Sequence, residues 1–163
     1  MGADLYIEKL RRPVKAEWQP KFDAAVSLRN AATDEIAKSA AQKLINEAYD
    51  HLHADEHYFR DSYNATSVLQ RLGLSWWRDL EPDVHDEDAD INVSPEACRV
   101  FLEKIQSAEF VPITRAELES RHATVDDDEN SAEVWNKYFS EKRDRLVAFL
   151  KRAIENGGMY ASC

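Results

Sequence analysis

Two long segments of the 163-residue chain repeat their apolar side chains at spacings of three and four residues. This spacing places the apolar side chains on one face of an α-helix. We therefore predict helices over residues 33–57 and 132–156, with Ser131 as the N-cap of the second and Gly157 as its C-terminal stop. The second helix is expected to turn residues 141–145 mostly to water, and the two helices are expected to pack against each other.

Shorter elements complete the predicted fold. Helices are predicted over residues 20–30, from Pro95 after a Ser94 cap, and after Thr114, which stands three residues before Glu117 in a capping-box pattern. Weak alternation in ADLYI and GMYASC indicates that the two ends of the chain form strands that pair. With only four Gly and five Pro, a β-sandwich is disfavoured. We predict a mainly α, single-domain, bundle-like fold over residues 1–163, with a small sheet joining the terminal strands.

Composition limits the classes of function. The net charge is −10, and eleven of the 31 acidic residues lie within residues 79–90 and 126–129. Without clustered Lys and Arg, direct binding to nucleic acid is disfavoured. Two cysteines make no disulfide framework, and no stretch approaches the ~20 apolar residues of a membrane-spanning helix. These features favour a cytoplasmic protein with no membrane association.

The central stretch YFRDSYNATSVLQRLGLSWWRDL, residues 58–80, concentrates aromatic and arginine side chains. It predicts a short helix over residues 63–72, closed by Gly73 in the left-handed conformation. Adjacent tryptophans point apart in either a helix or a strand, so Trp76 and Trp77 cannot both fill one core pocket. The stretch is either a core seam with surface ion pairs or a binding groove, because Trp, Tyr and Arg dominate binding hot spots. The candidate binding residues are Tyr58, Arg60, Asp61, Tyr63, Asn64, Trp76, Trp77 and Arg78.

Three segments, GADLYI at the start, YFRDSYN with LGLSWW in the centre and AIENGGMYASC at the end, resemble a family of bacterial and phage hypothetical proteins. The likeness covers both ends and the centre of the chain, with acidic segments between. No activity is known for that family, so the resemblance implies no catalytic residues. It draws attention to the central stretch as the feature that defines the protein.

Metal and catalytic motifs are incomplete. In HLHADEH, His53 and His57 share a helical face at metal-ligand spacing, but the H-E-x-x-H pattern is absent and both rings also extend the apolar row. The acidic segment 86–96 begins like a calcium loop, yet it has Ile91 and Ala97 where Gly and Glu are required, so a solvated loop is favoured. No nucleophile elbow and no phosphate-binding glycine loop occurs. No cofactor is expected.

The sequence favours a non-enzymatic module that binds a protein or regulates one. The alternative is a small metal-dependent enzyme built on His53 and His57. A third hypothesis is an acidic DNA mimic that inhibits a nucleic-acid-binding protein. It ranks lower because the carboxylates cluster in two loops rather than over a rigid face.

Overall fold

The computed structural model describes residues 2–62, 67–80, 84–85, 90–120 and 131–162. Within these ranges lie five strands and six helices, with one short 3₁₀ turn. In chain order they are β1 (Gly2–Tyr6), α1 (Glu8–Ala31), α2 (Glu35–Leu52), β2 (Tyr58–Ser62), η1 (Gln70–Leu72), α3 (Trp76–Asp79), β3 (Val84–His85), β4 (Asp90–Val93), α4 (Pro95–Ser107), α5 (Arg115–Ser120), α6 (Ala132–Glu155) and β5 (Met159–Ser162). None of the helices in these ranges has the length and apolar character needed to cross a bilayer.

The strands form one antiparallel sheet in the order β2-β1-β5-β4-β3. β1 lies between β2 and β5, so the N-terminal strand pairs directly with the C-terminal one. This pairing confirms the sheet expected from the two ends of the chain. The mainly α fold with a small sheet is also confirmed.

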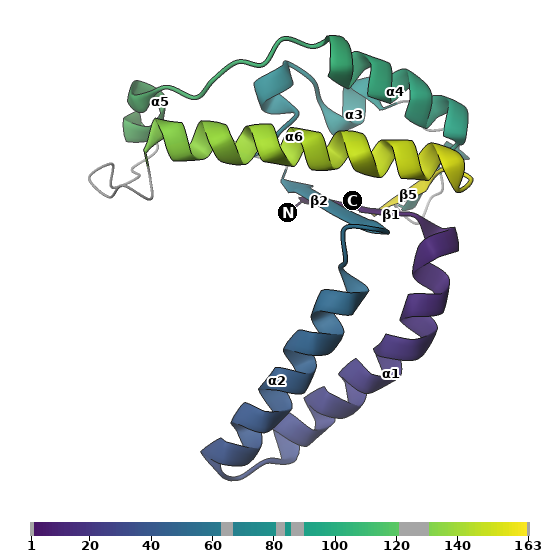
Figure 1. The fold of residues 1–163 in the computed structure, drawn as a ribbon, viewed down its shortest axis with the longest axis vertical. Coiled ribbons are helices and arrows are strands. Elements are labelled where there is room, and N and C mark those ends of the chain that lie inside the picture. Colours follow the sequence, from purple (N-terminus) through teal and green to yellow (C-terminus); the bar gives the residue numbers. More distant parts are fainter. Residues whose placement is uncertain (1, 63–66, 81–83, 86–89, 121–130, 163) are drawn as a thin grey trace.

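One face of the sheet carries the core. Helices α4 and α6 pack on each other, and α6 lies across the sheet (Figure 1). Strand residues of alternate positions, including Leu5 and Phe59, are buried there against Phe101, Leu146 and Phe149. Burial of these large side chains supplies most of the driving force for folding this part of the chain.

The remaining long helices form a hairpin that projects from the sheet on the side opposite α6 (Figure 1). In it α2 packs along α1, so the expectation that α2 and α6 would pack together is wrong. The expected helix over residues 20–30 is also too short, because α1 begins at Glu8 and contains Pro13 and Pro20. Leu10 packs on the main core and Ala25 on α2, so both halves of α1 are held in line despite the prolines.

The predicted helix starts are confirmed where a side chain caps them. Ser94, Thr114 and Ser131 each accept a hydrogen bond from the backbone N–H three residues later. Ser94 and Ser131 are the N-caps of α4 and α6. Side-chain capping satisfies backbone N–H groups that the first turn leaves without partners.

Two local expectations are wrong. Residues 58–62 form a strand, and residues 67–72, the described part of the helix expected over 63–72, contain only the turn η1, which Gly73 closes with φ 65°. The segment expected as an acidic loop includes β4, while residues 86–89 lie outside the described residues. Both segments gain their hydrogen bonds from neighbouring strands, which no local pattern reveals.

The turn between α6 and β5 depends on Gly158. Its φ is 98°, and a Cβ atom there would lie 2.2 Å from the Val93 carbonyl oxygen. Gly73 also has a positive φ, but a Cβ there would meet nothing within 4 Å.

We expect Gly158→Ala to lower the free energy of unfolding by at least about 2 kcal/mol more than Gly73→Ala does. The Gly73 variant suffers only the left-handed strain of about 1–2 kcal/mol, whereas the Gly158 variant also clashes with the backbone. Urea unfolding of the two variants checks this, and equal costs would contradict it.

Candidate binding face

Strand β2 divides the central stretch between the two faces of the sheet. Successive side chains of a strand point to opposite faces. Phe59 and Asp61 therefore point into the core, while Tyr58 and Arg60 lie on the other face. The residues YFRDS thus belong partly to a core seam and partly to a second surface.

Asp61 is the polar centre of the core side and is only 1% exposed. Its Oδ1 lies 2.8 Å from Lys142 Nζ of α6 and accepts a hydrogen bond from the Val68 N–H at 3.1 Å. Its Oδ2 accepts from the Ser67 hydroxyl at 2.7 Å and from Trp76 Nε1 at 2.9 Å. Four donors from three segments of the chain therefore meet one buried carboxylate.

The other residues of the central stretch are separated. Trp76 is buried against Phe101, and Arg78 is exposed and pairs with Asp79. Arg71 is buried and makes a bidentate ion pair with Glu117 of α5 at 2.6 and 3.1 Å. Tyr63, Asn64 and the side chain of Trp77 lie outside the described residues. Within the described part, the stretch does not form one continuous groove.

The partner of Asp61 was not predicted. Lys142 belongs to the charged run 141–145, which was expected to face mostly water, yet Lys142 is buried. The sequence offered a weak sign, because Lys142 lies three residues after Phe139 and four before Leu146, on the buried face of α6.

The Asp61–Lys142 pair can be tested by its coupling. Removing one partner leaves an uncompensated charge in the core, so Lys142→Met is expected to lower the free energy of unfolding by about 3–5 kcal/mol. The double variant Lys142→Met/Asp61→Asn is expected to lose less free energy of unfolding than the sum of the losses in the two single variants. Denaturant unfolding of the four proteins in the cycle gives the coupling. Strict additivity would contradict the pairing.

The opposite face of the sheet carries a row of tyrosines. Tyr58 of β2 stands opposite Tyr6 of β1, Tyr6 opposite Tyr160 of β5, and Tyr160 opposite Asn92 of β4. Directly opposed residues on one face have adjoining side chains. We call this row, together with Asp4 and Arg60 of the neighbouring row, the tyrosine face.

Contacts at the base of the hairpin hold two of the tyrosines. The Arg11 guanidinium lies 3.6 Å from the centre of the Tyr6 ring, and the His53 ring meets Tyr58 edge-on at 4.7 Å. The Tyr58 hydroxyl donates a hydrogen bond of 2.5 Å to Asp4. At the far end of the row, Tyr160 is half-buried and Asn92 is exposed. The row therefore runs from a fixed end under the hairpin to an accessible end.

Two phenols of the tyrosine face, those of Tyr6 and Tyr58, have raised pKa values and stay protonated at neutral pH. Burial raises the pKa of Tyr6, and Arg11 opposes this only in part. Burial and the hydrogen bond to Asp4 raise the pKa of Tyr58 further. The negative charge of Asp4 raises the pKa of Arg60, which remains a cation. The face therefore combines neutral phenols with the Arg60–Asp4 ion pair, a set suited to hydrogen bonding and stacking.

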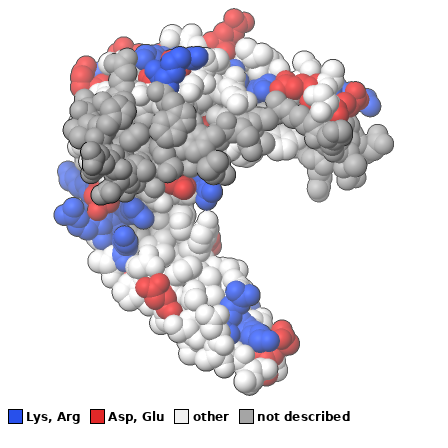
Figure 2. Space-filling view, turned by 180° about the vertical axis from the view of Figure 1, so that it is seen from behind, with Lys and Arg blue, Asp and Glu red and all other residues white. Residues whose placement is uncertain are grey.

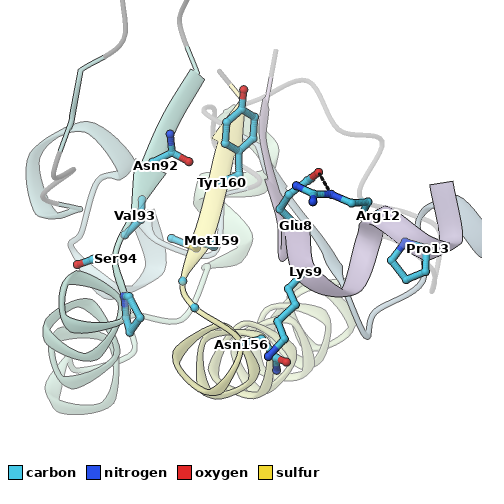
Figure 3. Close-up of a pocket in the computed structure, with 13 residues that line it drawn as sticks. Glu8, Lys9, Arg12, Pro13, Asn92, Val93, Ser94, Asn156, Met159 and Tyr160 are labelled. Carbon is cyan, nitrogen blue, oxygen red and sulfur yellow. Dashed lines mark ion pairs between the residues drawn. The ribbon is translucent and has the colours of Figure 1, made fainter. Parts of the chain in front are cut away.

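A pocket of about 560 Å³ adjoins the accessible end of the row. Figure 3 shows Tyr160 between Asn92 and the Glu8–Arg12 ion pair, with Lys9 and Asn156 at the other end. Lysine and arginine gather at the base of the hairpin in Figure 2, where α1 begins EKLRRPVK. The pocket thus combines an aromatic wall with nearby positive charge.

Sequence reasoning missed most of this face. Tyr6, Tyr160 and Asn92 were not among the candidate residues, although Tyr58 and Arg60 were. The available sign was the alternation in ADLYI and GMYAS, which places Tyr6 and Tyr160 on the side opposite Leu5 and Ala161. Only the pairing of β1 with both β2 and β5 brings the tyrosines together.

The histidines of HLHADEH contact the backbone. His53 Nδ1 lies 2.9 Å from the Tyr49 carbonyl oxygen, and His57 Nε2 lies 3.1 Å from that of Leu52. Because a carbonyl only accepts, each of these nitrogens carries a proton and donates. Among the residues that the structure describes, no three His, Cys, Asp or Glu side chains gather as a metal-binding group. Most of the acidic residues on which the DNA-mimic and calcium-loop hypotheses depend lie outside the described ranges.

His57 makes stability depend on pH. It is buried, and burial lowers its pKa below the usual 6.5. As the pH falls below 6.5, the unfolded chain takes up a proton that the folded chain resists, so the free energy of unfolding falls, by at most about 1.4 kcal/mol per pH unit. We expect His57→Gln to lose less stability than the wild type between pH 7.5 and 5.5, both values being about one unit from that pKa. Parallel losses in urea unfolding would contradict this.

Comparison of the chain with protein-family models, with curated proteins and with solved structures gives no match.

Proposed function

We propose that the protein is a non-enzymatic binding module that engages another protein through its tyrosine face and the adjoining pocket. The observation that supports this most is the in-register row of Tyr58, Tyr6, Tyr160 and Asn92 on the sheet face that α4 and α6 leave uncovered. Tyrosine and arginine provide large contact area at low entropic cost and are enriched where binding energy concentrates.

The chemistry of the face favours recognition over catalysis. Tyr6 and Tyr58 have raised pKa values and remain protonated, so their phenols are poorly suited to act as general bases near neutral pH. Asp4 accepts from Tyr58 and lies 3.7 Å from Arg60, which fixes it between two partners. These groups hold one another in place, as in a preformed binding surface, with Tyr58 buried, Asp4 half-buried and Arg60 exposed.

A protein is the partner that this surface fits best. The residues outside the hairpin carry most of the acidic charge, which repels nucleic acid over the body of the protein. The face itself offers aromatic rings and hydrogen-bond donors beside a pocket large enough for one or two side chains.

The accessible end of the row gives the sharpest test. We expect Tyr160→Ala to keep the far-UV circular dichroism of the wild type but to weaken capture of the partner from a cell extract about 30-fold, which is a hot-spot loss of roughly 2 kcal/mol. Tyr138→Ala is the matched control, because Tyr138 is an exposed tyrosine of α6 outside this face.

Affinity purification with the tagged wild type and the two variants provides the measurement. Retention of partner by Tyr138→Ala and its loss by Tyr160→Ala would support the tyrosine face. Equal recovery with both variants would place the contact elsewhere.

A further inference from the structure

The two broad sides of the α1–α2 hairpin differ in chemistry. A helix advances ~100° per residue, and the row of α1 that faces α2 includes Trp18, Phe22 and Ala25. On α2 the facing row includes Ala41 and Ala48. Rotations of about 120° in one sense from these rows reach apolar residues of both helices toward the tip of the hairpin, and Glu17 and Glu47 toward its base. Rotations in the other sense reach mostly polar residues.

Each rotation is taken about the helix axis, looking along the chain from its N-terminus. Because α1 and α2 are antiparallel, rotations in the same sense on the two helices point to the same broad side of the hairpin. One side, here called the apolar side, carries Ala24, Leu28, Ala31, Ile36, Ala40 and Leu44. The other, the polar side, carries Gln19, Asp23, Gln42 and Asn46, with hydrogen bonds between Gln19 and Asp23 and between Gln42 and Asn46. Toward its tip the hairpin is therefore amphipathic.

The apolar side is exposed to an unusual degree. Leu28 is 59% exposed, Ile36 84% and Leu44 49%. Between the helices, the fully buried residues are mostly small, namely Ala25, Ala41, Ala48 and Leu52. Two helices that bury so little between them gain little from tertiary packing, and a large exposed apolar patch marks an interaction site.

We propose that the apolar side is covered by the same side of a second copy of this chain, giving an antiparallel four-helix bundle of two hairpins. The side alternates large and small residues, with Leu28, Ile36 and Leu44 set among alanines. In a two-fold contact each residue meets its counterpart reciprocally, so the large side chains of one copy rest on the alanines of the other.

The available area suits such a dimer. The 18 residues of α2 extend about 27 Å. With helices roughly 9 Å apart, the hairpin offers a side of about 500 Å² in projection, and more in accessible area. This is close to the ~600 Å² per partner at the lower end of specific interfaces. Because this area is at the lower limit for a specific interface, we expect a weak dimer with a dissociation constant in the micromolar range.

The distribution of charge favours the antiparallel arrangement. Residues 8–52 carry eight Lys or Arg and seven Asp or Glu, a net +1, so the remaining residues carry −11. Nearly neutral hairpins approach without strong repulsion. An antiparallel pairing places the two acidic bodies at opposite ends of the bundle, farther apart than the ~8 Å screening length of physiological salt.

Sedimentation velocity of the full chain from about 1 to about 200 μM tests the proposal, a range that brackets micromolar dissociation constants. We expect a monomer–dimer equilibrium for the wild type. We expect Ile36→Glu/Leu44→Glu, on the apolar side, to stay monomeric throughout, because two carboxylates would be buried against their counterparts. Gln19→Glu/Asn46→Glu on the polar side is the matched control and is expected to dimerise like the wild type.

The single variant Ile36→Lys guards against loss of folding. Its position is almost fully exposed, so the substitution leaves the hairpin intact while weakening the dimer at least tenfold. A wild type that is monomeric at every concentration would overturn the proposal and leave the side to a different protein. Dimers of equal strength in the apolar-side and polar-side variants would overturn it as well. Either result leaves capture of a partner by the tyrosine face unaffected.

Discussion

A single buried carboxylate joins four parts of the structure. Asp61 of β2 contacts Lys142 of α6 and Trp76 of α3. It also contacts Ser67 and Val68, which lie between β2 and α3 in the chain. Each donor alone would not offset the cost of placing a charge in the core, but together they satisfy the carboxylate. The arrangement ties the sheet to α6 and directs the chain after β2 back across the core.

This constraint also determines which face of the sheet is open. Since side chains alternate along a strand, directing Asp61 and Phe59 inward directs Tyr58 and Arg60 outward. The antiparallel register then aligns Tyr6 and Tyr160 with Tyr58. A shift of β2 by one residue would bury Arg60 and break the row, so the core polar contact and the proposed binding surface depend on the same register.

Local patterns predicted what local interactions determine. The caps Ser94 and Ser131 fixed the starts of α4 and α6, and Gly73 closed its turn in the expected conformation. The strand at 58–62 was missed because its hydrogen bonds come from β1, more than 50 residues away. The burial of Lys142 was missed for a similar reason. Its partner Asp61 is distant in the sequence, so the charged run around Lys142 gives no sign of the pair. The start of α1 was missed because its two prolines suggest a break that packing on both halves overrides.

Tyrosine-specific chemical labelling, read by mass spectrometry, tests the central claim most directly. The labels would be introduced once in buffer and once in an extract of cells that naturally contain the protein. We expect Tyr160 to react in buffer and to be protected in the extract, while the exposed Tyr138 of α6 reacts equally in both. Equal labelling of Tyr160 under the two conditions would contradict the assignment of the tyrosine face as the partner-binding surface.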